Sequence, residues 1–116
     1  LKETRNYAVG RYGMETQRLC SVLDNHLSSR LFLVGEEYSI ADMICFPWFS
    51  GLKRGIYKFG GITCNDFLEI EKNYPSACAW ADRINARPAV VRGLTVCGWN
   101  SDVTKPWLEG DKKEEI

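Results

Sequence analysis

The stretch Tyr38-Ser39-Ile40-Ala41-Asp42-Met43 decides the fold class of this 116-residue chain, because it marks the start of a helix. The hydroxyl of Ser39 can accept a bond from the first free backbone N–H groups, and Asp42 can reach back to the N–H of Ser39. The negative charge of Asp42 also suits the positive end of a helix dipole. Asp stands here in place of the Glu or Gln of the usual capping box. We therefore expect Ser39 and Asp42 to determine structure and to have no catalytic role.

The helix that starts at this box is apolar on nearly every side and carries Pro47 in its interior. A helix of that kind is typical of the buried centre of a domain. The proline should bend it or remove one backbone hydrogen bond. Trp48, which follows the proline, is expected to be a packing residue.

A longer helix is predicted before the box, over residues 7–29. Apolar and small residues recur there at three- and four-residue steps and predict a core face, namely Tyr12, Thr16, Leu19, Leu23 and Leu27. The opposite face carries Glu15, Arg18 and Asp24, which we expect in solvent. His26, the single histidine, comes near the end of this helix and is expected to be a solvated residue or a partner of the helix dipole.

Three shorter helices are predicted after Gly51. Asn65-Asp66 can cap a helix over 67–71, Tyr74-Pro75 opens another, and Arg87-Pro88 opens the last. The second of these carries an apolar stripe formed by Ala77, Trp80, Ala81 and Ile84. No stretch alternates as a strand should. The pattern predicts one all-α domain over residues 1–98, followed by an irregular, charged tail over 99–116.

Composition excludes several classes of function. Lys plus Arg and Asp plus Glu total 15 each, a balance that argues against binding nucleic acid or an anionic membrane. No apolar run is long enough to span a bilayer. The five cysteines contain no C-x-x-C pair, so we read them as small buried residues in a reducing cytoplasm and expect no metal site. With a single histidine, a Ser-His-Asp or Cys-His catalytic set has little to build on, and we expect no catalytic residue.

Residues around the box extend the pattern in a recognisable order: Arg11-Tyr12, Glu15, Arg18-Leu19, Val22-Leu23-Asp24, Leu27, Gly35-Glu36, Pro47-Trp48 and Arg87-Pro88-Ala89-Val90. Over residues 6 to 98 the chain resembles the C-terminal, all-helical domain of the glutathione S-transferase family. The likeness is closest to the nu-class, YghU-like branch of disulfide-bond reductase type. The resemblance implies a glutathione transferase C-terminal-like helical bundle.

Members of that family carry a thioredoxin-like domain before the helical one, and it supplies most of the glutathione site and the residue that activates the thiol. The chain starts at Leu1, so we expect that domain and the first long helix to be missing from it. The resemblance implies a cytoplasmic homodimer for the full-length protein. It also implies that this chain alone has no transferase or reductase activity.

Arg11 is the site residue that the resemblance singles out, as a ligand of a glutathione carboxylate reaching across from the partner subunit. A guanidinium suits that task, because it is planar, always charged and binds a carboxylate through two parallel bonds. The alternative is an ordinary solvated arginine. Tyr7, one turn earlier, is a candidate for the substrate pocket. Gly10 and Gly13 depart from the family pattern and indicate either a close backbone approach or a frayed helix start.

Two functions follow from the resemblance, with glutathione as co-substrate of the full-length protein. One is conjugation of glutathione to an electrophile, and the other is glutathione-dependent reduction of a disulfide, which the nu-class likeness favours. The alternative is a non-catalytic protein-interaction module with the same helical fold, because a fold does not fix a function.

Overall fold

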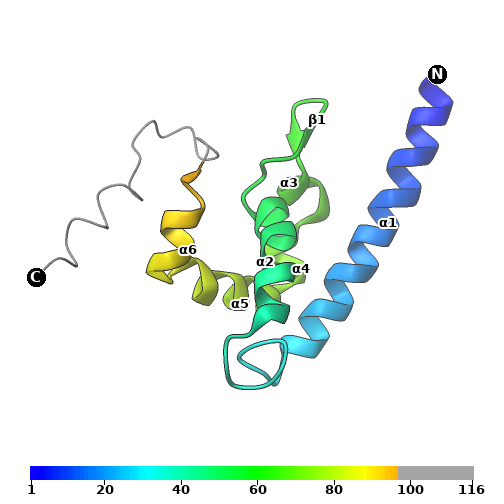
Figure 1. The fold of residues 1–116 in the computed structure, drawn as a ribbon. Helices are drawn as coiled ribbons and strands as arrows, with labels where there is room; N and C mark the ends of the chain where they lie inside the picture. Colours follow the sequence, from blue (N-terminus) through cyan, green and yellow to red (C-terminus); the bar gives the residue numbers. More distant parts are fainter. Residues whose placement is uncertain (97–116) are drawn as a thin grey trace, which may run out of the picture. The chain divides into compact units, whose positions relative to one another are not determined.

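The computed structural model describes residues 1–96, and within them the expected all-α fold is confirmed. The helices are α1 (Lys2–Leu27), α2 (Ile40–Lys53), α3 (Cys64–Leu68), α4 (Ile70–Asn73), α5 (Pro75–Asn85) and α6 (Pro88–Gly93), as Figure 1 shows. The chain divides into two compact units, residues 1–81 and 82–116, with the boundary inside α5. The predicted tail over 99–116 lies outside the described residues, and the boundary at residue 98 stays a prediction.

Helix α1 begins at Lys2, earlier than the residue 7 expected from the sequence. It runs without interruption through Gly10 and Gly13, so the frayed start that these glycines indicated is wrong. Cys20 and Leu27 are the buried residues of α1. Tyr12 was expected in the core but is 69 % exposed. At roughly 100° per residue, it is turned some 60–80° away from the line of Cys20 and Leu27.

The box at the start of α2 forms as expected, with Ser39 as the N-cap and Asp42 as its third helical residue. One oxygen of Asp42 accepts the backbone N–H of Ser39 at 2.9 Å and the Ser39 hydroxyl at 3.2 Å. The other oxygen accepts the backbone N–H of Leu33 at 3.0 Å and the indole N–H of Trp80 at 2.8 Å. Asp42 is completely buried. It therefore joins the start of α2 to the preceding loop and to α5.

Helix α2 is buried on one side only, which corrects the expectation of a helix buried all round. Phe46 and Phe49 are 4 % exposed, and their rings lie 6.3 and 6.2 Å from the ring of Trp80. Several apolar residues on its other side are more than half exposed, namely Ile40, Met43, Ile44 and Trp48. Trp48, expected to be a packing residue, is 72 % exposed. An apolar pattern cannot tell how many sides of a helix meet a neighbour, and within residues 1–96 only one side does so.

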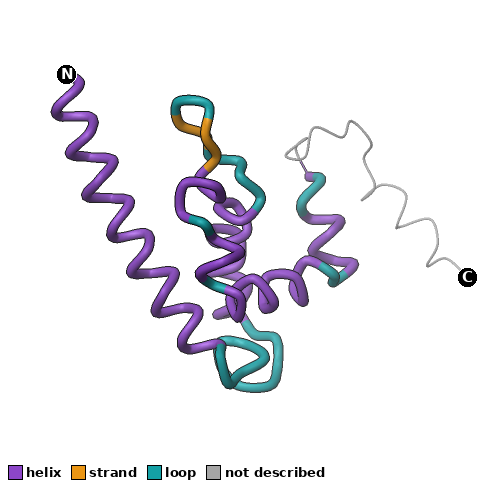
Figure 2. The backbone as a smooth tube through the Cα atoms, turned by 180° about the vertical axis from the view of Figure 1, so that it is seen from behind, coloured by secondary structure: helices purple, strands orange, loops and turns teal. Residues whose placement is uncertain are grey.

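A two-stranded antiparallel hairpin, β1 (Lys58–Phe59) and β2 (Ile62–Thr63), follows α2 and was not predicted. Its strands, coloured separately in Figure 2, are too short to show an alternating pattern. The loop between them is Gly60-Gly61, and both residues have positive φ angles, of 57° and 86°. A two-residue hairpin turn of type I′ needs positive φ at both positions, which glycine adopts without strain.

The cap of α3 also differs from the prediction. Thr63 is the N-cap, and its hydroxyl accepts the backbone N–H of Asp66 at 3.1 Å and donates to the Asp66 carboxylate at 2.7 Å. The predicted Asn65-Asp66 cap and the helix over 67–71 are wrong, because Glu69 adopts a left-handed conformation with a φ of 47° and separates α3 from α4. The helix starts at Pro75 and at Pro88 are confirmed, and the stripe of Ala77, Trp80, Ala81 and Ile84 is buried as expected.

Two hydrogen bonds attach α1 to the beginning of α5. The carboxylate of Asp24 accepts the backbone N–H of Ala77 at 2.9 Å, and the hydroxyl of Tyr74 donates to the carbonyl of Gln17 at 3.3 Å. Ala77 is the third residue of α5, so Asp24 acts as a cap supplied by another helix. The sequence pattern placed Asp24 on the solvent face, whereas the side chain is half-buried.

None of the helices in the described part of the chain combines the length and apolar content needed to cross a membrane.

Candidate functional site

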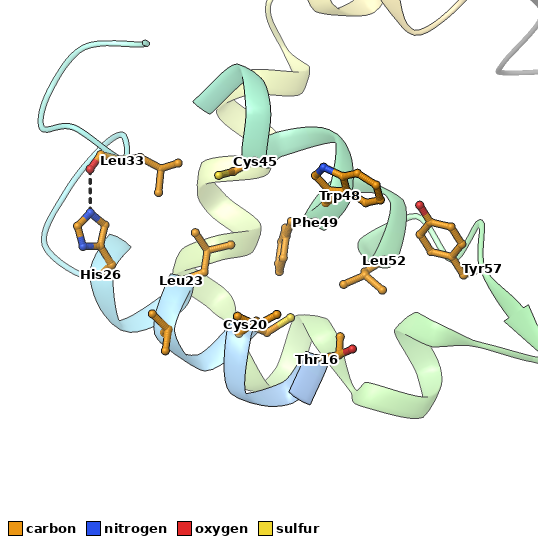
Figure 3. A pocket seen from close by; sticks show the side chains of 12 residues that line it. Thr16, Cys20, Leu23, His26, Leu33, Cys45, Trp48, Phe49, Leu52 and Tyr57 are labelled. Atoms are coloured by element: carbon orange, nitrogen blue, oxygen red, sulfur yellow. Dashed lines mark hydrogen bonds between the residues drawn. The ribbon is translucent and has the colours of Figure 1, made fainter. Parts of the chain in front are cut away.

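A large apolar groove lies between α1 and α2, with a volume of about 780 Å³. Figure 3 shows Thr16, Cys20 and His26 entering it from α1, and Cys45, Trp48 and Leu52 from α2. Its full lining is mostly aliphatic and aromatic, and consists of Thr16, Leu19, Cys20, Val22, Leu23, His26, Leu33, Cys45, Trp48, Phe49, Leu52 and Tyr57. This groove was not predicted, because helical spacing and apolar character placed Leu19, Leu23 and Trp48 in a closed core.

Two of the polar side chains on the groove wall are already engaged within the chain. The hydroxyl of Thr16 donates to the carbonyl of Tyr12 at 2.8 Å. The Nε2 atom of His26 lies 2.8 Å from the carbonyl of Leu33, drawn as the dashed line in Figure 3. Because a carbonyl only accepts, Nε2 carries the proton, and Nδ1 accepts a bond from Arg30 at 2.9 Å. The groove thus offers apolar contact, with few polar groups to orient a ligand.

Arg11 and Tyr7, the two site residues expected from the sequence, lie on the outer surface of α1. Tyr7 is 74 % exposed and Arg11 is also exposed. Neither belongs to the groove lining, so the structure does not bring them together with it. The guanidinium of Arg11 makes no hydrogen bond or ion pair with any residue in the described range 1–96. Arg11 is therefore available to an external anion, although this alone assigns it no ligand.

Glu15, one turn after Arg11, is held by Arg18 instead. The Nη2 and Nε atoms of Arg18 donate to the two carboxylate oxygens of Glu15 at 2.7 and 2.9 Å. The hydrogen bonds from Arg18 are the main reason that the pKa of Glu15 lies below its ordinary value. Burial opposes this shift in part, and the positive charges of Arg18 and Arg11 add smaller effects that lower the pKa of Glu15. The same pairing raises the pKa of Arg18.

The cysteines only partly follow the expectation of burial. Cys20 and Cys78 are buried, Cys64 is half-buried, and Cys45 is exposed in the groove. Burial raises the pKa of Cys20 to about 11, with a further contribution from the neighbouring Cys78. Cys97 lies outside the described residues. Among residues 1–96, no cluster of histidine, cysteine and acidic side chains could hold a metal ion.

Comparison with known proteins gives one matching family model, described as "Glutathione S-transferase, C-terminal domain", over residues 14–88. The disulfide-bond oxidoreductase YghU of Escherichia coli is 40 % identical over 90 residues, which are 78 % of this chain and 30 % of that protein. The disulfide-bond oxidoreductase YfcG of the same bacterium is 37 % identical over 92 residues, 79 % of this chain and 37 % of the relative. Glutathione S-transferase 2 of Schizosaccharomyces pombe is 40 % identical over 86 residues, 72 % of this chain and 37 % of the relative. The chain spans about a third of the length of these relatives.

Proposed function

Because the chain belongs to the glutathione S-transferase family through its C-terminal domain, we propose that it forms the helical part of a glutathione-using protein. The full-length protein combines it with a thioredoxin-like domain that activates the thiol, and works as a cytoplasmic homodimer. Glutathione is the co-substrate. The chain contributes an anchor for a glutathione carboxylate, and its groove contributes apolar packing surface.

Reduction of a disulfide is the reaction we favour, since two of the relatives are named disulfide-bond oxidoreductases. A glutathione thiolate attacks one sulfur of the disulfide, forms a mixed disulfide and expels the other sulfur as a thiolate. A second glutathione thiolate then attacks the glutathione sulfur and gives oxidised glutathione and the second substrate thiolate. Conjugation to an electrophile is the other reaction, supported by the relative named as a glutathione S-transferase.

The guanidinium of Arg11, which is unpaired within residues 1–96, is the observation that carries this proposal. A charge-assisted bond contributes roughly 1.5–3 kcal/mol, so Arg11→Ala should weaken glutathione binding about ten- to a hundredfold. Arg11→Lys should restore it only in part, because lysine lacks the two-pronged geometry. Folding stability should change by no more than about 0.5 kcal/mol.

The test is calorimetric titration of glutathione into the full-length protein and its Arg11 variants. Lys2→Ala, which removes another exposed positive charge from α1, is the matched control and should leave the affinity unchanged. If Arg11→Ala binds glutathione as wild type does while remaining folded, Arg11 is an ordinary solvated residue. The 116-residue chain alone should show no reductase or transferase activity above a heat-treated sample.

A non-catalytic interaction module is the second candidate, and one observation favours it. Ile40, Ile44 and Trp48 form an exposed apolar face on α2, a feature typical of surfaces that meet another protein. A full-length protein without a thioredoxin-like domain and without glutathione binding would support this alternative.

A further inference from the structure

The ion pair between Glu15 and Arg18 lies on α1 about one helical turn after Arg11. Each oxygen of Glu15 accepts a bond from Arg18, one from Nη2 at 2.7 Å and the other from Nε at 2.9 Å. A guanidinium that donates two parallel bonds to one carboxylate forms the most directional ion pair available to side chains. Glu15 is therefore turned toward the side of α1 that carries Arg18.

Arg11 precedes Glu15 by four residues, the spacing at which side chains on a helix become neighbours. Glu15 is thus an internal carboxylate that can compete for the guanidinium of Arg11. The positive charge of Arg11 acts on Glu15, although it forms no bond with it. Of the two arginines within reach of Glu15, only Arg18 is bonded to it.

We infer that Arg18 is a positioning residue, which holds Glu15 so that Arg11 stays free for an external carboxylate. This inference rests on the proposed function, in which that carboxylate belongs to glutathione. The pair acts in two ways. It prevents Glu15 from folding back onto Arg11, and it neutralises a negative charge that would repel an anionic ligand one helical turn away.

The solvent exposure of the Glu15–Arg18 ion pair limits how much it can change glutathione affinity. Side chains of Arg18 and Glu15 are 60 % and 37 % exposed, so solvent screens their charges. An exposed pair at helix spacing changes an equilibrium by roughly twofold. Arg18→Met should accordingly lower glutathione affinity about twofold, far less than Arg11→Ala, and the loss should shrink at high salt.

A double-mutant cycle separates this role from the general attraction of a positive charge. Glutathione affinity is measured for wild type, Arg18→Met, Glu15→Gln and the double variant of the full-length protein. We expect Arg18→Met to weaken binding only while Glu15 is present, and the double variant to bind as Glu15→Gln does. Arg18→Lys keeps the charge but cannot form two parallel bonds to one carboxylate. Its glutathione affinity should therefore lie between those of wild type and Arg18→Met. An equal loss in both backgrounds would overturn the inference.

A second measurement does not involve glutathione. The Nε–H of Arg11 is followed by nitrogen NMR in the same four proteins, and its exchange with water is measured. It should exchange more slowly in Arg18→Met, where Glu15 is released toward Arg11, and at the wild-type rate in the double variant. Unchanged exchange in Arg18→Met overturns the inference. If exchange slows but Arg11→Ala leaves glutathione affinity unchanged, the positioning role stands and the proposed function fails.

Discussion

The indole N–H of Trp80 donates to the carboxylate of Asp42 at 2.8 Å, between two completely buried side chains that are 38 residues apart in sequence. Within residues 1–96, no cationic side chain is bonded to this carboxylate. It is stabilised by neutral donors: the backbone N–H groups of Leu33 and Ser39, the Ser39 hydroxyl and the indole. A buried charge is tolerated only when its bonds are complete. Removing any one partner should therefore have effects beyond the local cap.

Substitution of Ser39 and substitution of Asp42 in the capping box should lower the free energy of unfolding by different amounts. Ser39→Ala should lower the free energy of unfolding by about 1 kcal/mol, the usual worth of an N-cap. Asp42→Ala should cost about 3 kcal/mol or more, because it also leaves the N–H groups of Leu33 and Trp80 buried without acceptors. From sequence alone the two substitutions appear equivalent. Urea unfolding of both variants and the double variant is the measurement.

The double variant should lose less than the sum of the two, since Ser39 and Asp42 bond to each other. Strictly additive losses would show that the two residues act independently.

The stability that depends on Asp42 should disappear in acid. Burial raises the pKa of Asp42, but the four hydrogen bonds outweigh it and leave the pKa below its ordinary value. The unfolded chain therefore takes up the proton first, at a pKa of about 3.9. The stability contributed by ionised Asp42 is fully present above the pKa of the unfolded chain. It is lost as the pH falls through the lower pKa of the folded chain. Urea midpoints of wild type and Asp42→Asn should converge below about pH 4. A constant gap from pH 7 to pH 3 would contradict this.

The side chain of Asp24 should contribute more to folding stability than an exposed acidic side chain on the same helix does. Asp24→Ala removes the bond to Ala77 that caps α5 and should cost about 1 kcal/mol, within 0.5–2. Asp24→Asn keeps an acceptor oxygen and should cost less. Glu3→Ala, an exposed acid at the other end of α1, serves as the control and should change the unfolding free energy by less than about 0.5 kcal/mol. If Asp24→Ala and Glu3→Ala changed the unfolding free energy equally, Asp24 would not stabilise the start of α5 as a cap.

Replacement of two helical glycines by alanine should change folding stability in opposite directions. A Cβ at Gly10 would meet no atom within 4 Å, so Gly10→Ala should stabilise the chain by up to about 1 kcal/mol through helix propensity. At Gly51 a Cβ would lie 2.9 Å from the ring of Tyr57 and 3.1 Å from Ile56, so Gly51→Ala should destabilise it by about 1–3 kcal/mol. Thermal melts of both variants test the pair, and a stabilising Gly51→Ala would refute the contact with Tyr57.

The cysteines should react with iodoacetamide in an order set by burial. Cys45 is exposed and, near pH 8, should be modified first among the cysteines of residues 1–96. Cys20 should be modified slowly, because it is buried and its pKa of about 11 leaves roughly one thiol in a thousand ionised. Mass mapping of peptides over time gives the rates, and in urea the difference should vanish. Equal native rates for Cys20 and Cys45 would contradict the burial of Cys20.

Structural features that depend on residues close together in the chain could be predicted from the sequence. The box of Ser39 and Asp42 and the proline helix starts at Pro75 and Pro88 are local motifs, and each occurs as predicted. The stripe around Trp80 needs only helical spacing. The α3 cap was missed because Thr63, Asn65 and Asp66 are all good capping residues, and local propensity does not rank them.

Features that depend on how elements meet could not be predicted. Nothing in the sequence of α1 shows that Asp24 will reach Ala77, or that Leu19 and Leu23 will line an open groove. The one-sided burial of α2 also depends on its neighbours. The role of Arg11 as a glutathione ligand remains a prediction, since a guanidinium that is unpaired among the described residues is compatible with binding but does not identify a ligand.

The bond from Asp24 to Ala77 also constrains the order of events during folding. Helix α5 has 11 residues, too few to be stable by itself in water. One of its first backbone N–H groups is satisfied by a side chain 53 residues earlier, so the chain must close a long loop before that bond can form. The nucleation of α5 therefore depends on the packing of α1 against its N-terminal end. The two helices should gain and lose protection from hydrogen exchange together, as one cooperative unit, despite their separation along the chain.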